Sequence, residues 1–342
     1  MSSDQPIVIR GAFSSPYSLK MRAVLRYRHI PFRWILKDSK WDTFPPGNVP
    51  VIPVLIFAGD DGDYTETLVD SSPQILRLEQ DFADRSLMPT DPALAFIDGL
   101  IEDFADEWVT KMMYHYRWAY DEDIEKAGTL LPLDQNLQLD DVTHETFHDF
   151  IIERQVGRRA LVGSTPQNQP IIEASFGRVL DILQKHFEHN DFLLGDRPGR
   201  GDFALYGQLK PLLWWDPTPT AIAVERSPKT IMWVDRVDDL SWWPNENEGW
   251  AAPHALSGTT RDLLTEAGRS YTPFMLANAA ALEAGDDEVV CEIAGQEYRQ
   301  APFKYQAKCL RWLRDAYAAL DDASRASVDE VLAGTGCEPL VG

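Results

Sequence analysis

Two periodicities of apolar residues divide the chain near residue 86. Before that point, short apolar runs alternate with polar turns, a pattern typical of strands and helices joined by short connections. After it, apolar residues recur every three or four positions over long stretches, which is typical of packed helices. The sequence therefore predicts a mixed α and β unit followed by a mostly helical one.

Four strands and two helices are predicted in the first unit. The strands are runs rich in β-branched or aromatic residues, at 7–10, 32–36, 51–57 and 66–69. A helix over 19–29 is indicated by apolar residues at helical spacing, with Ser15 suited to its N-cap and Pro16 to its first position. A second helix is predicted to follow residues 70–73.

Most of the second unit is predicted to be helical. Helices are expected over 93–120, 143–159, 169–189, 258–282 and 306–320, with further ones inside 192–207 and from 228 onward. Residues 132–142 are expected to form a polar connection, and residues 288–300 a hairpin that turns at Ala294 and Gly295.

These patterns divide the chain into two units, and the resemblance described below implies a further boundary at residue 240. We expect an α+β domain over residues 1–86, an all-α domain over residues 92–240 and an extension over residues 241–342. The extension is expected to fold as helix, β-hairpin and helix, and to pack on the helical domain. Its role cannot be inferred from the pattern, although it is long enough to cover a site or to build an interface.

Composition and charge narrow the class of protein. Hydrophobic content of 44% and charged content of 25% are globular values. No apolar run reaches the roughly 18 residues needed to span a bilayer, and the polar start of the chain lacks a signal-peptide pattern. We therefore expect a cytoplasmic protein that does not contact a membrane.

The net charge of −22 is unevenly placed. Residues 1–85 hold 10 Lys and Arg against 11 Asp and Glu, so almost all of the excess negative charge lies beyond them. Nucleic acid is excluded as a partner because a basic surface is missing. An anionic ligand would be tolerated by the first unit and repelled by the rest.

The three cysteines lie late in the chain, at Cys291, Cys309 and Cys337. They match no metal-binding spacing, and an odd number argues against a disulfide framework. We expect them to be reduced thiols, and we expect no metal.

Three short motifs in the first unit resemble those of one family. Residues 15–18, Ser-Pro-Tyr-Ser, resemble the Cys-Pro-Tyr-Cys of glutaredoxins with both sulfurs replaced by oxygen. Residues 52–55, Ile-Pro-Val-Leu, resemble the cis-proline motif of glutathione transferases, and Asp70-Ser71 with Ile75 resembles their Glu-Ser-x-x-Ile motif. The chain thus resembles cytosolic glutathione transferases, whose first domain is thioredoxin-like.

A later segment adds to the resemblance. Residues 192–207 are similar to the part of the transferase helical domain in which a leucine-glycine turn precedes a capped, buried helix. Gly199 stands where the family usually has Ser or Thr, and Asp202 is expected to bond the free amides at the helix start. The resemblance covers about residues 6–240, and the common family lacks the extension.

The resemblance implies that a serine hydroxyl activates the thiol of glutathione, the co-substrate. A free thiol has a pKa of about 8.5, and a hydroxyl donor at a helix N-terminus favours the thiolate. Lowering that pKa by about 2 units is worth roughly 2.7 kcal/mol. Ser15 is the expected donor because it matches the first cysteine of the dithiol motif, with Ser14 and Ser18 as rivals. Because no cysteine precedes Cys291, glutaredoxin-like reductase activity is expected to be absent.

The resemblance also implies which residues contact the glutathione tripeptide. The backbone of Ile52, beside a cis Pro53, is expected to pair with the cysteinyl backbone; Pro53 is preferred to Pro50 because the apolar strand follows it at once. Asp70 is expected to meet the γ-glutamyl ammonium and Ser71 the carboxylate. The loop residues expected near the glycyl carboxylate are Lys37, Lys40 and Trp41, although loop lysines are often only solvated.

A small apolar electrophile is expected to bind between the domains. The candidate wall residues are Tyr17, Trp108, Met112, His115, Tyr116 and Trp118. An aromatic stripe at helical spacing fits a packed core equally well, and His115 fits a packed histidine. The resemblance further implies a homodimer and a role in detoxification. A glutathione-dependent lyase or ether-cleaving enzyme and a non-catalytic binding protein of the same fold remain the alternatives.

Overall fold

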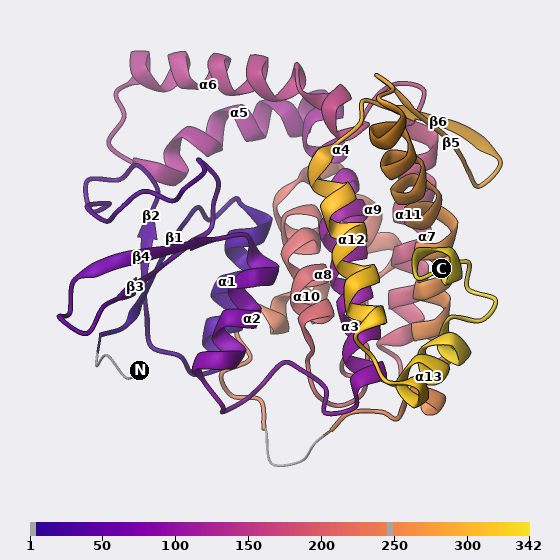
Figure 1. Ribbon diagram of the computed structural model, residues 1–342. Coiled ribbons are helices and arrows are strands. Elements are labelled where there is room, and N and C mark those ends of the chain that lie inside the picture. Colours follow the sequence, from indigo (N-terminus) through magenta and orange to yellow (C-terminus); the bar gives the residue numbers. More distant parts are fainter. Residues whose placement is uncertain (1–4, 245–248) are drawn as a thin grey trace.

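The computed structural model describes residues 5–244 and 249–342. The first residues of the polar N-terminus, and four residues of the extension, lie outside this described part. Figure 1 shows the sheet with its two helices on the left, the two helices of residues 121–156 above it, and the other helices on the right. The fold is therefore a thioredoxin-like α/β domain followed by a helical domain, as the sequence predicts.

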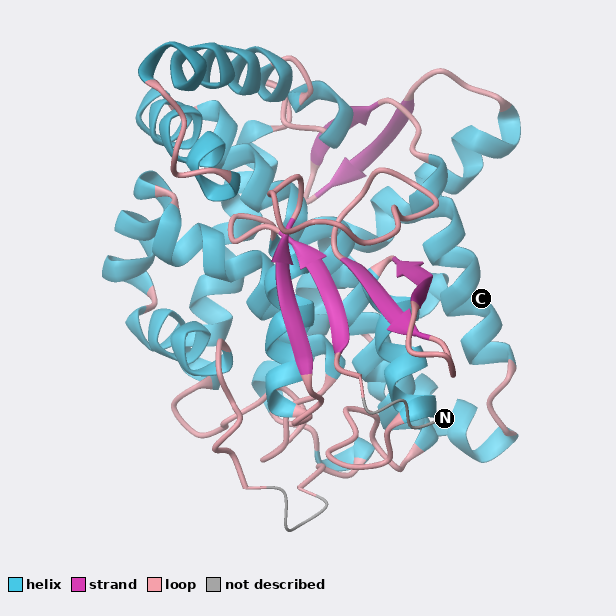
Figure 2. Ribbon diagram, turned by 90° about the vertical axis from the view of Figure 1, so that its left-hand side faces the viewer, coloured by secondary structure: helices cyan, strands magenta, loops and turns pink. Residues whose placement is uncertain are grey.

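The N-terminal sheet has four strands in the order β2-β1-β3-β4 (Figure 2). The strands are β1 (Ile7–Gly11), β2 (Phe32–Leu36), β3 (Val54–Ala58) and β4 (Tyr64–Val69). β2 is parallel to β1, whereas β3 runs antiparallel to β1 and β4 antiparallel to β3. All four predicted strands are confirmed, with ends that differ by no more than a few residues.

Alternation along the strands explains why both faces of this sheet are covered. Ile7 and Ile9 point to the face packed by α1 (Pro16–Tyr27) and α2 (Ser71–Asp81). Val8, between them, joins a second apolar cluster with Val54 and Ile56 on the opposite face. The two helices begin where the sequence predicts, because Ser15 caps α1 and Asp70 precedes α2.

Eight α-helices follow up to residue 237. They are α3 (Pro92–Phe104), α4 (Thr110–Ala119), α5 (Asp121–Gln135), α6 (Asp141–Val156), α7 (Gln169–His186), α8 (Arg200–Lys210), α9 (Pro217–Arg226) and α10 (Pro228–Val237). Short segments connect some of them: π-helical η1 (Ala105–Val109) and η3 (Pro211–Trp215), and 3-10 helical η2 (Arg159–Val162).

The structure differs from the predictions for this domain in three details. The connection predicted over 132–142 is shorter in the structure and covers residues 136–140, because α5 continues to Gln135 with Pro132 inside it and α6 begins at Asp141. The sequence offers Thr143 as the N-cap of the helix over 143–159, but the N-cap of α6 is Asp140, whose carboxylate accepts a hydrogen bond from the Thr143 backbone N–H at 2.9 Å. The single helix expected over 93–120 is also interrupted by the π-turn η1.

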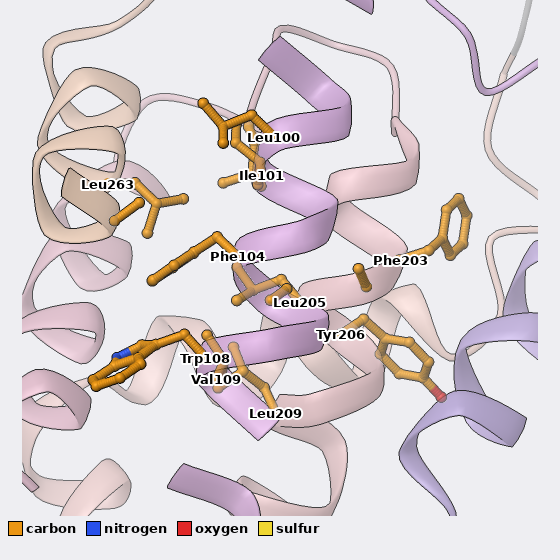
Figure 3. Close-up of a cluster of buried hydrophobic side chains, with 14 of the residues drawn as sticks. Leu100, Ile101, Phe104, Trp108, Val109, Phe203, Leu205, Tyr206, Leu209 and Leu263 are labelled. Carbon is orange, nitrogen blue, oxygen red and sulfur yellow. The ribbon is translucent and has the colours of Figure 1, made fainter. Parts of the chain in front are cut away.

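Helix α8 lies at the centre of the molecule, buried between α1 and α3. Figure 3 shows the apolar side chains of α3 and η1 directed toward Leu263, and Tyr206 of α8 directed toward α1. The Asp202 carboxylate accepts hydrogen bonds from the backbone N–H groups of Gly199 and Leu193, both at 3.0 Å. The structural role expected for Asp202 is confirmed, and Gly199 is indeed the N-cap.

The C-terminal extension packs along the helical domain. It contains α11 (Gly258–Ala284), β5 (Val289–Ile293), β6 (Gln296–Gln300), α12 (Lys304–Ala318) and α13 (Asp322–Leu332), with short 3-10 turns η4 (Pro253–Ala255) and η5 (Glu338–Leu340). The predicted hairpin is present, and Ala294 and Gly295 both have positive φ at its turn. Figure 1 shows α12 lying across α3, with which it is in contact. Helix α13 was not predicted.

None of the helices in the described ranges is both long enough and apolar enough to cross a bilayer.

Candidate functional site

The three motifs of the first domain meet at one edge of its sheet. Arg10, near the end of β1, pairs with Val54 at the start of β3, and Val54 pairs with Val69 at the end of β4. The turn that leads into α1, the Ile52–Pro53 peptide and Asp70 therefore lie beside one another. The Ile52–Pro53 bond is cis, as expected from the sequence.

A buried glutamine links the cis-proline segment to the second helix. The Gln74 side-chain amide of α2 donates hydrogen bonds to the carbonyl oxygens of Pro53 at 3.0 Å and Leu68 at 2.7 Å. Because Gln74 is fully buried, these bonds fix the start of α2 relative to Pro53. The backbone of Ile52 is thus held in place next to Asp70.

The three serines of the first turn have different hydrogen-bonding partners. Ser15 is half-buried, and its hydroxyl oxygen accepts from the Ser18 backbone N–H at 3.3 Å. Ser18 is fully buried and its oxygen accepts from the Ala12 N–H at 3.4 Å. Ser14 donates its proton to the Asp134 carboxylate at 2.6 Å. In the described part of the chain, the protons of the Ser15 and Ser18 hydroxyls have no acceptor, and of these two only Ser15 is partly exposed.

Asp134 of α5 binds the turn that precedes α1. Besides the Ser14 hydroxyl, it accepts hydrogen bonds from the backbone N–H groups of Phe13 at 3.1 Å and Ser14 at 2.9 Å. Arg117 of α4, paired with Asp216 at 3.0 Å, donates to the Ser14 carbonyl at 3.2 Å. The sequence analysis missed these contacts because it placed Asp134 in an irregular connection.

Asp70 is shared between the first domain and the extension. Its side chain is 19% exposed, and its Oδ2 accepts a hydrogen bond from the Tyr305 hydroxyl of α12 at 2.6 Å. The Lys308 ammonium lies 4.0 Å from the same oxygen. No sequence signal placed α12 here, because residues 70 and 305 are far apart in the chain.

Ser71 faces the interior instead of the site's surface. It is 4% exposed, and its hydroxyl accepts from the buried Lys20 ammonium at 3.1 Å. Lys20 in turn is paired with Glu102 at 2.7 Å and Asp106 at 2.6 Å. The hydroxyl of Ser71 is therefore engaged in a buried ionic network.

The loop expected to meet the glycyl carboxylate starts at the same edge of the sheet. The Lys37 backbone N–H donates to the Gly11 carbonyl at 3.0 Å, so the loop leaves β2 next to the turn that carries the serines. Lys37 itself is paired with Asp38. The Lys40 ammonium lies 5.2 Å from the ring centre of Trp41, which is 68% exposed.

Five of the six aromatic-stripe candidates lie in the core and not on an open wall. They are Trp108, Met112, His115, Tyr116 and Trp118. Trp108 is covered by the extension: the rings of Tyr298 and Phe274 lie 5.8 and 6.1 Å from its own, and its Nε1–H donates to Ser175 at 2.9 Å. The expectation that these five line an electrophile site is corrected, since the packed-core alternative describes them.

His115 is a packed histidine. Its Nδ1 lies 2.8 Å from the Ser164 hydroxyl and its Nε2 lies 3.2 Å from the Glu173 carboxylate. Burial lowers the pKa of His115, although the bond to Glu173 opposes this. A neutral, hydrogen-bonded ring in the core is the result.

Tyr17 is the one member of that set that is half-buried beside the site. Its hydroxyl donates to the Asp106 carbonyl at 2.8 Å. Burial, together with the charges of Glu107 and Asp106, raises the pKa of Tyr17 well above its usual value. Tyr17 therefore stays protonated at neutral pH and can act only as a neutral hydroxyl.

Two surface pockets lie away from this edge. One of about 790 Å³ is formed at the far ends of α1 and α2, with Arg28 and Arg85 among its lining residues. The other, of about 380 Å³, lies between α7 and α10 beside Trp233. Neither contains a residue of the three motifs, so the site described here is assigned from the motifs and their contacts.

Residues 11–86 match the family model described as the N-terminal domain of glutathione S-transferases. The match contains all three motifs and the elements that carry them. The first domain is thus glutathione S-transferase-like. No curated protein matches the sequence.

Solved structures with a similar fold include three bacterial proteins. A glutathione S-transferase-like protein from Pseudomonas syringae is 17% identical, covering 68% of this chain and 66% of that one, with a TM-score of 0.44. The beta-etherase LigF from Sphingobium sp. strain SYK-6 is 19% identical over 68% of this chain and 95% of its own, with a TM-score of 0.46. A glutathione S-transferase from Methylobacterium radiotolerans, in complex with glutathione sulfonate, is 20% identical over 68% and 91%, with a TM-score of 0.37.

Proposed function

We propose that this glutathione S-transferase-like protein binds glutathione at the sheet edge formed by Ser15, the Ile52–Pro53 peptide and Asp70. The observation that carries the proposal is how the three serine hydroxyls are hydrogen-bonded and exposed. Ser15 caps the first helix, is half-buried and has no acceptor for its proton, whereas Ser18, whose proton also has no acceptor, is fully buried, and Ser14 gives its proton to Asp134. A thiol placed against Ser15 meets a hydrogen-bond donor and the positive end of a helix dipole.

The chemistry that follows is thiolate attack on a small electrophile. The bound thiol gives its proton to solvent, and the Ser15 hydroxyl donates a hydrogen bond to the sulfur anion without ionising. The sulfur electron pair then forms a carbon–sulfur bond while the leaving group departs with its bonding pair. The role of Ser15 is thus electrostatic, and it acts before and during the attack.

The segment that precedes β3 and helix α12 of the extension hold the rest of the tripeptide. The Ile52 backbone pairs with the cysteinyl residue, and the Asp70 carboxylate receives the γ-glutamyl ammonium alongside the Tyr305 hydroxyl. Because the Ser71 hydroxyl is buried with Lys20, we assign the γ-glutamyl carboxylate to Lys308. Lys37 and Lys40 stay candidates for the glycyl carboxylate.

A retention and activity experiment tests this function. The purified protein is passed over immobilised glutathione and assayed with an aryl halide, as wild type, Ser15→Ala and the matched control Ser14→Ala. We expect retention of all three and a loss of activity of about 10²-fold for Ser15→Ala only, the usual scale for one donor to a developing anion. Absence of retention of the wild type would refute the proposed site.

A non-catalytic role is the second candidate, favoured by one observation. Residues that were expected to form the electrophile wall lie in the core, covered by the extension. Retention on glutathione without turnover of aryl halides, epoxides or aryl ethers would identify a binding protein. Turnover of the ethers alone would identify an ether-cleaving enzyme that uses the same thiolate.

A further inference from the structure

The turn that leads into α1 and carries Ser15 buries little of its own surface. Phe13 is 50% exposed, and Ser14 and Ser15 are only half-buried. Within the turn, the Ser15 backbone N–H donates to the Ala12 carbonyl at 3.2 Å. A segment with so little buried surface keeps one conformation only where further hydrogen bonds fix it. The position of the Ser15 hydroxyl therefore depends on the side chains that bind this turn.

The Asp134 carboxylate of α5 accepts three hydrogen bonds from the turn. Its Oδ1 accepts from the Phe13 backbone N–H at 3.1 Å, and its Oδ2 accepts from the Ser14 backbone N–H at 2.9 Å and from the Ser14 hydroxyl at 2.6 Å. The last distance is typical of a hydroxyl bound to a charged carboxylate. Among the described residues, the two backbone N–H groups have no other acceptor. One side chain thus binds two successive residues of the turn.

A second side chain of the helical domain binds the carbonyl group of the same residue. Arg117 of α4 donates to the Ser14 carbonyl at 3.2 Å, and its Nε donates to the Asp216 carboxylate at 3.0 Å. Arg117 is 5% exposed and Asp216 is fully buried, so this contact belongs to the core. Both the N–H and the carbonyl group of Ser14 are therefore held by side chains of the helical domain.

Asp134 is placed against the local preference of its own helix. It is the next-to-last residue of α5, where the negative end of the helix dipole disfavours a carboxylate. A residue that departs from such a local rule often serves a functional site. The helix itself is fixed near its start, where the Thr218 backbone N–H donates to the Asp123 carboxylate at 3.1 Å. Figure 1 shows α5 above the N-terminal sheet, so an anchored helix presents Asp134 to the turn.

We propose that Asp134 is a positioning residue for the activation of the thiol by Ser15. By holding the turn, it keeps the Ser15 hydroxyl and the start of α1 in one place relative to the sulfur. By binding the Ser14 hydroxyl, it also prevents that group from donating to the sulfur in place of Ser15. The proposal rests on the function proposed above, and it gives the helical domain a part in the chemistry of the first domain.

Kinetics and thiol titration of Asp134→Ala in the full-length protein test the proposal. We expect kcat with an aryl halide to fall about tenfold or more at saturating glutathione, since a displacement of about 1 Å can cost about 10²-fold. The pKa of the bound thiol should rise toward its free value of about 8.5. KM for glutathione should change little, because the contacts proposed for Ile52 and Asp70 remain. An unchanged kcat and an unchanged thiol pKa would overturn the proposal.

Further variants test whether Asp134 acts through Ser15. The double variant Ser15→Ala/Asp134→Ala should lose little more activity than Ser15→Ala alone, because no hydroxyl is left to position. Losses that multiply would contradict a positioning role. Glu122→Ala removes an exposed acid near the other end of α5 and is the matched control, which should behave as wild type. If Asp134→Ala does not fold, Asp134→Asn, which keeps the size of the side chain but accepts fewer hydrogen bonds, replaces it with the same expected directions.

Hydrogen exchange of the ligand-free protein distinguishes failure of this proposal from failure of the proposed function. The backbone N–H groups of Phe13 and Ser14 should exchange at least about tenfold faster in Asp134→Ala than in wild type, and at the wild-type rate in Glu122→Ala. If the wild type does not bind glutathione, or if Ser15→Ala is fully active, the proposed function fails. If Ser15→Ala loses activity while Asp134→Ala changes neither the exchange nor kcat, only the role of Asp134 is refuted.

Discussion

At the scale of single residues, the site combines local and distant contributions. Ser15 and Asp70 belong to short motifs, and their positions next to elements could be predicted because a cap residue lies beside the helix it caps. Asp134 and Tyr305 belong to other helices and contact Ser14 and Asp70 at the same edge of the sheet. No local sequence pattern can predict such a contact, because the residues are far apart in the chain. The sequence therefore indicated the residues that point to glutathione but not those that surround them.

Replacing the carboxylate of Asp70 tests its role in binding. Asp70→Asn keeps the shape and can still accept the Tyr305 hydrogen bond, but it removes the negative charge that we propose faces the γ-glutamyl ammonium. We expect KM for glutathione to rise about tenfold, equivalent to about 1.4 kcal/mol, with kcat little changed. Steady-state kinetics give both values. Asp63→Asn, in an exposed turn, is the control, and an unchanged KM for Asp70→Asn would show that the ammonium binds elsewhere.

At the scale of elements, the predictions succeed where a helix or strand is specified by its own sequence. The strands, α1, α7 and the β5–β6 hairpin have clear periodicity or turn residues, and the structure contains them. Helix α5 was missed because Pro132 and several acidic residues are typical of a connection, whereas the structure has Pro132 inside the helix. The burial of Trp108 could not be predicted either, because it depends on how the extension packs.

The contact between α1 and α8 positions the first turn of α1 and can be tested at one glycine. A Cβ atom at Gly207 would lie 2.7 Å from the Pro16 carbonyl oxygen and 3.0 Å from the Lys20 Cβ. Gly207→Ala should therefore push the two helices apart and lower the free energy of unfolding by about 1–3 kcal/mol. Urea denaturation measures this change.

A matched variant separates this clash from the general effect of adding a methyl group. Gly258→Ala adds the same group in the first turn of α11, where no atom lies within 4 Å. We expect its stability to stay within about 0.5 kcal/mol of wild type. Equal stabilities of the two variants would mean that α1 and α8 are not closely packed.

At the scale of the whole molecule, buried acids are the dominant electrostatic feature. Burial raises the pKa of Asp98 to about 7 and of Asp202 to about 8, with the partners Arg200 and Gly199 opposing the shift. Most of the net negative charge also lies beyond residue 85, in the helical domain and extension. Both features make the folded protein sensitive to high pH.

The protein should lose stability as the pH rises from 6 to 9. A folded-state pKa above the unfolded value of about 4 means that the native state binds more protons in the interval between them, so the free energy of unfolding falls with rising pH. For Asp103 and Asp202 this contribution is complete below about pH 4 and is lost as the pH passes 8. Urea midpoints at pH 6, 7.5 and 9 measure the trend, and a midpoint that increases over this range would contradict it.

The most direct test of the central claim is the pKa of the thiol of bound glutathione. Titration of the protein–glutathione complex, followed by the ultraviolet absorption of the thiolate, should give a value about 2 units below the free thiol's roughly 8.5. Ser15→Ala should return it toward that of free glutathione, whereas Ser14→Ala should leave it lowered. A bound thiol that titrates near 8.5 in the wild type, or an equally lowered pKa in Ser15→Ala, would show that the Ser15 hydroxyl does not stabilise the thiolate.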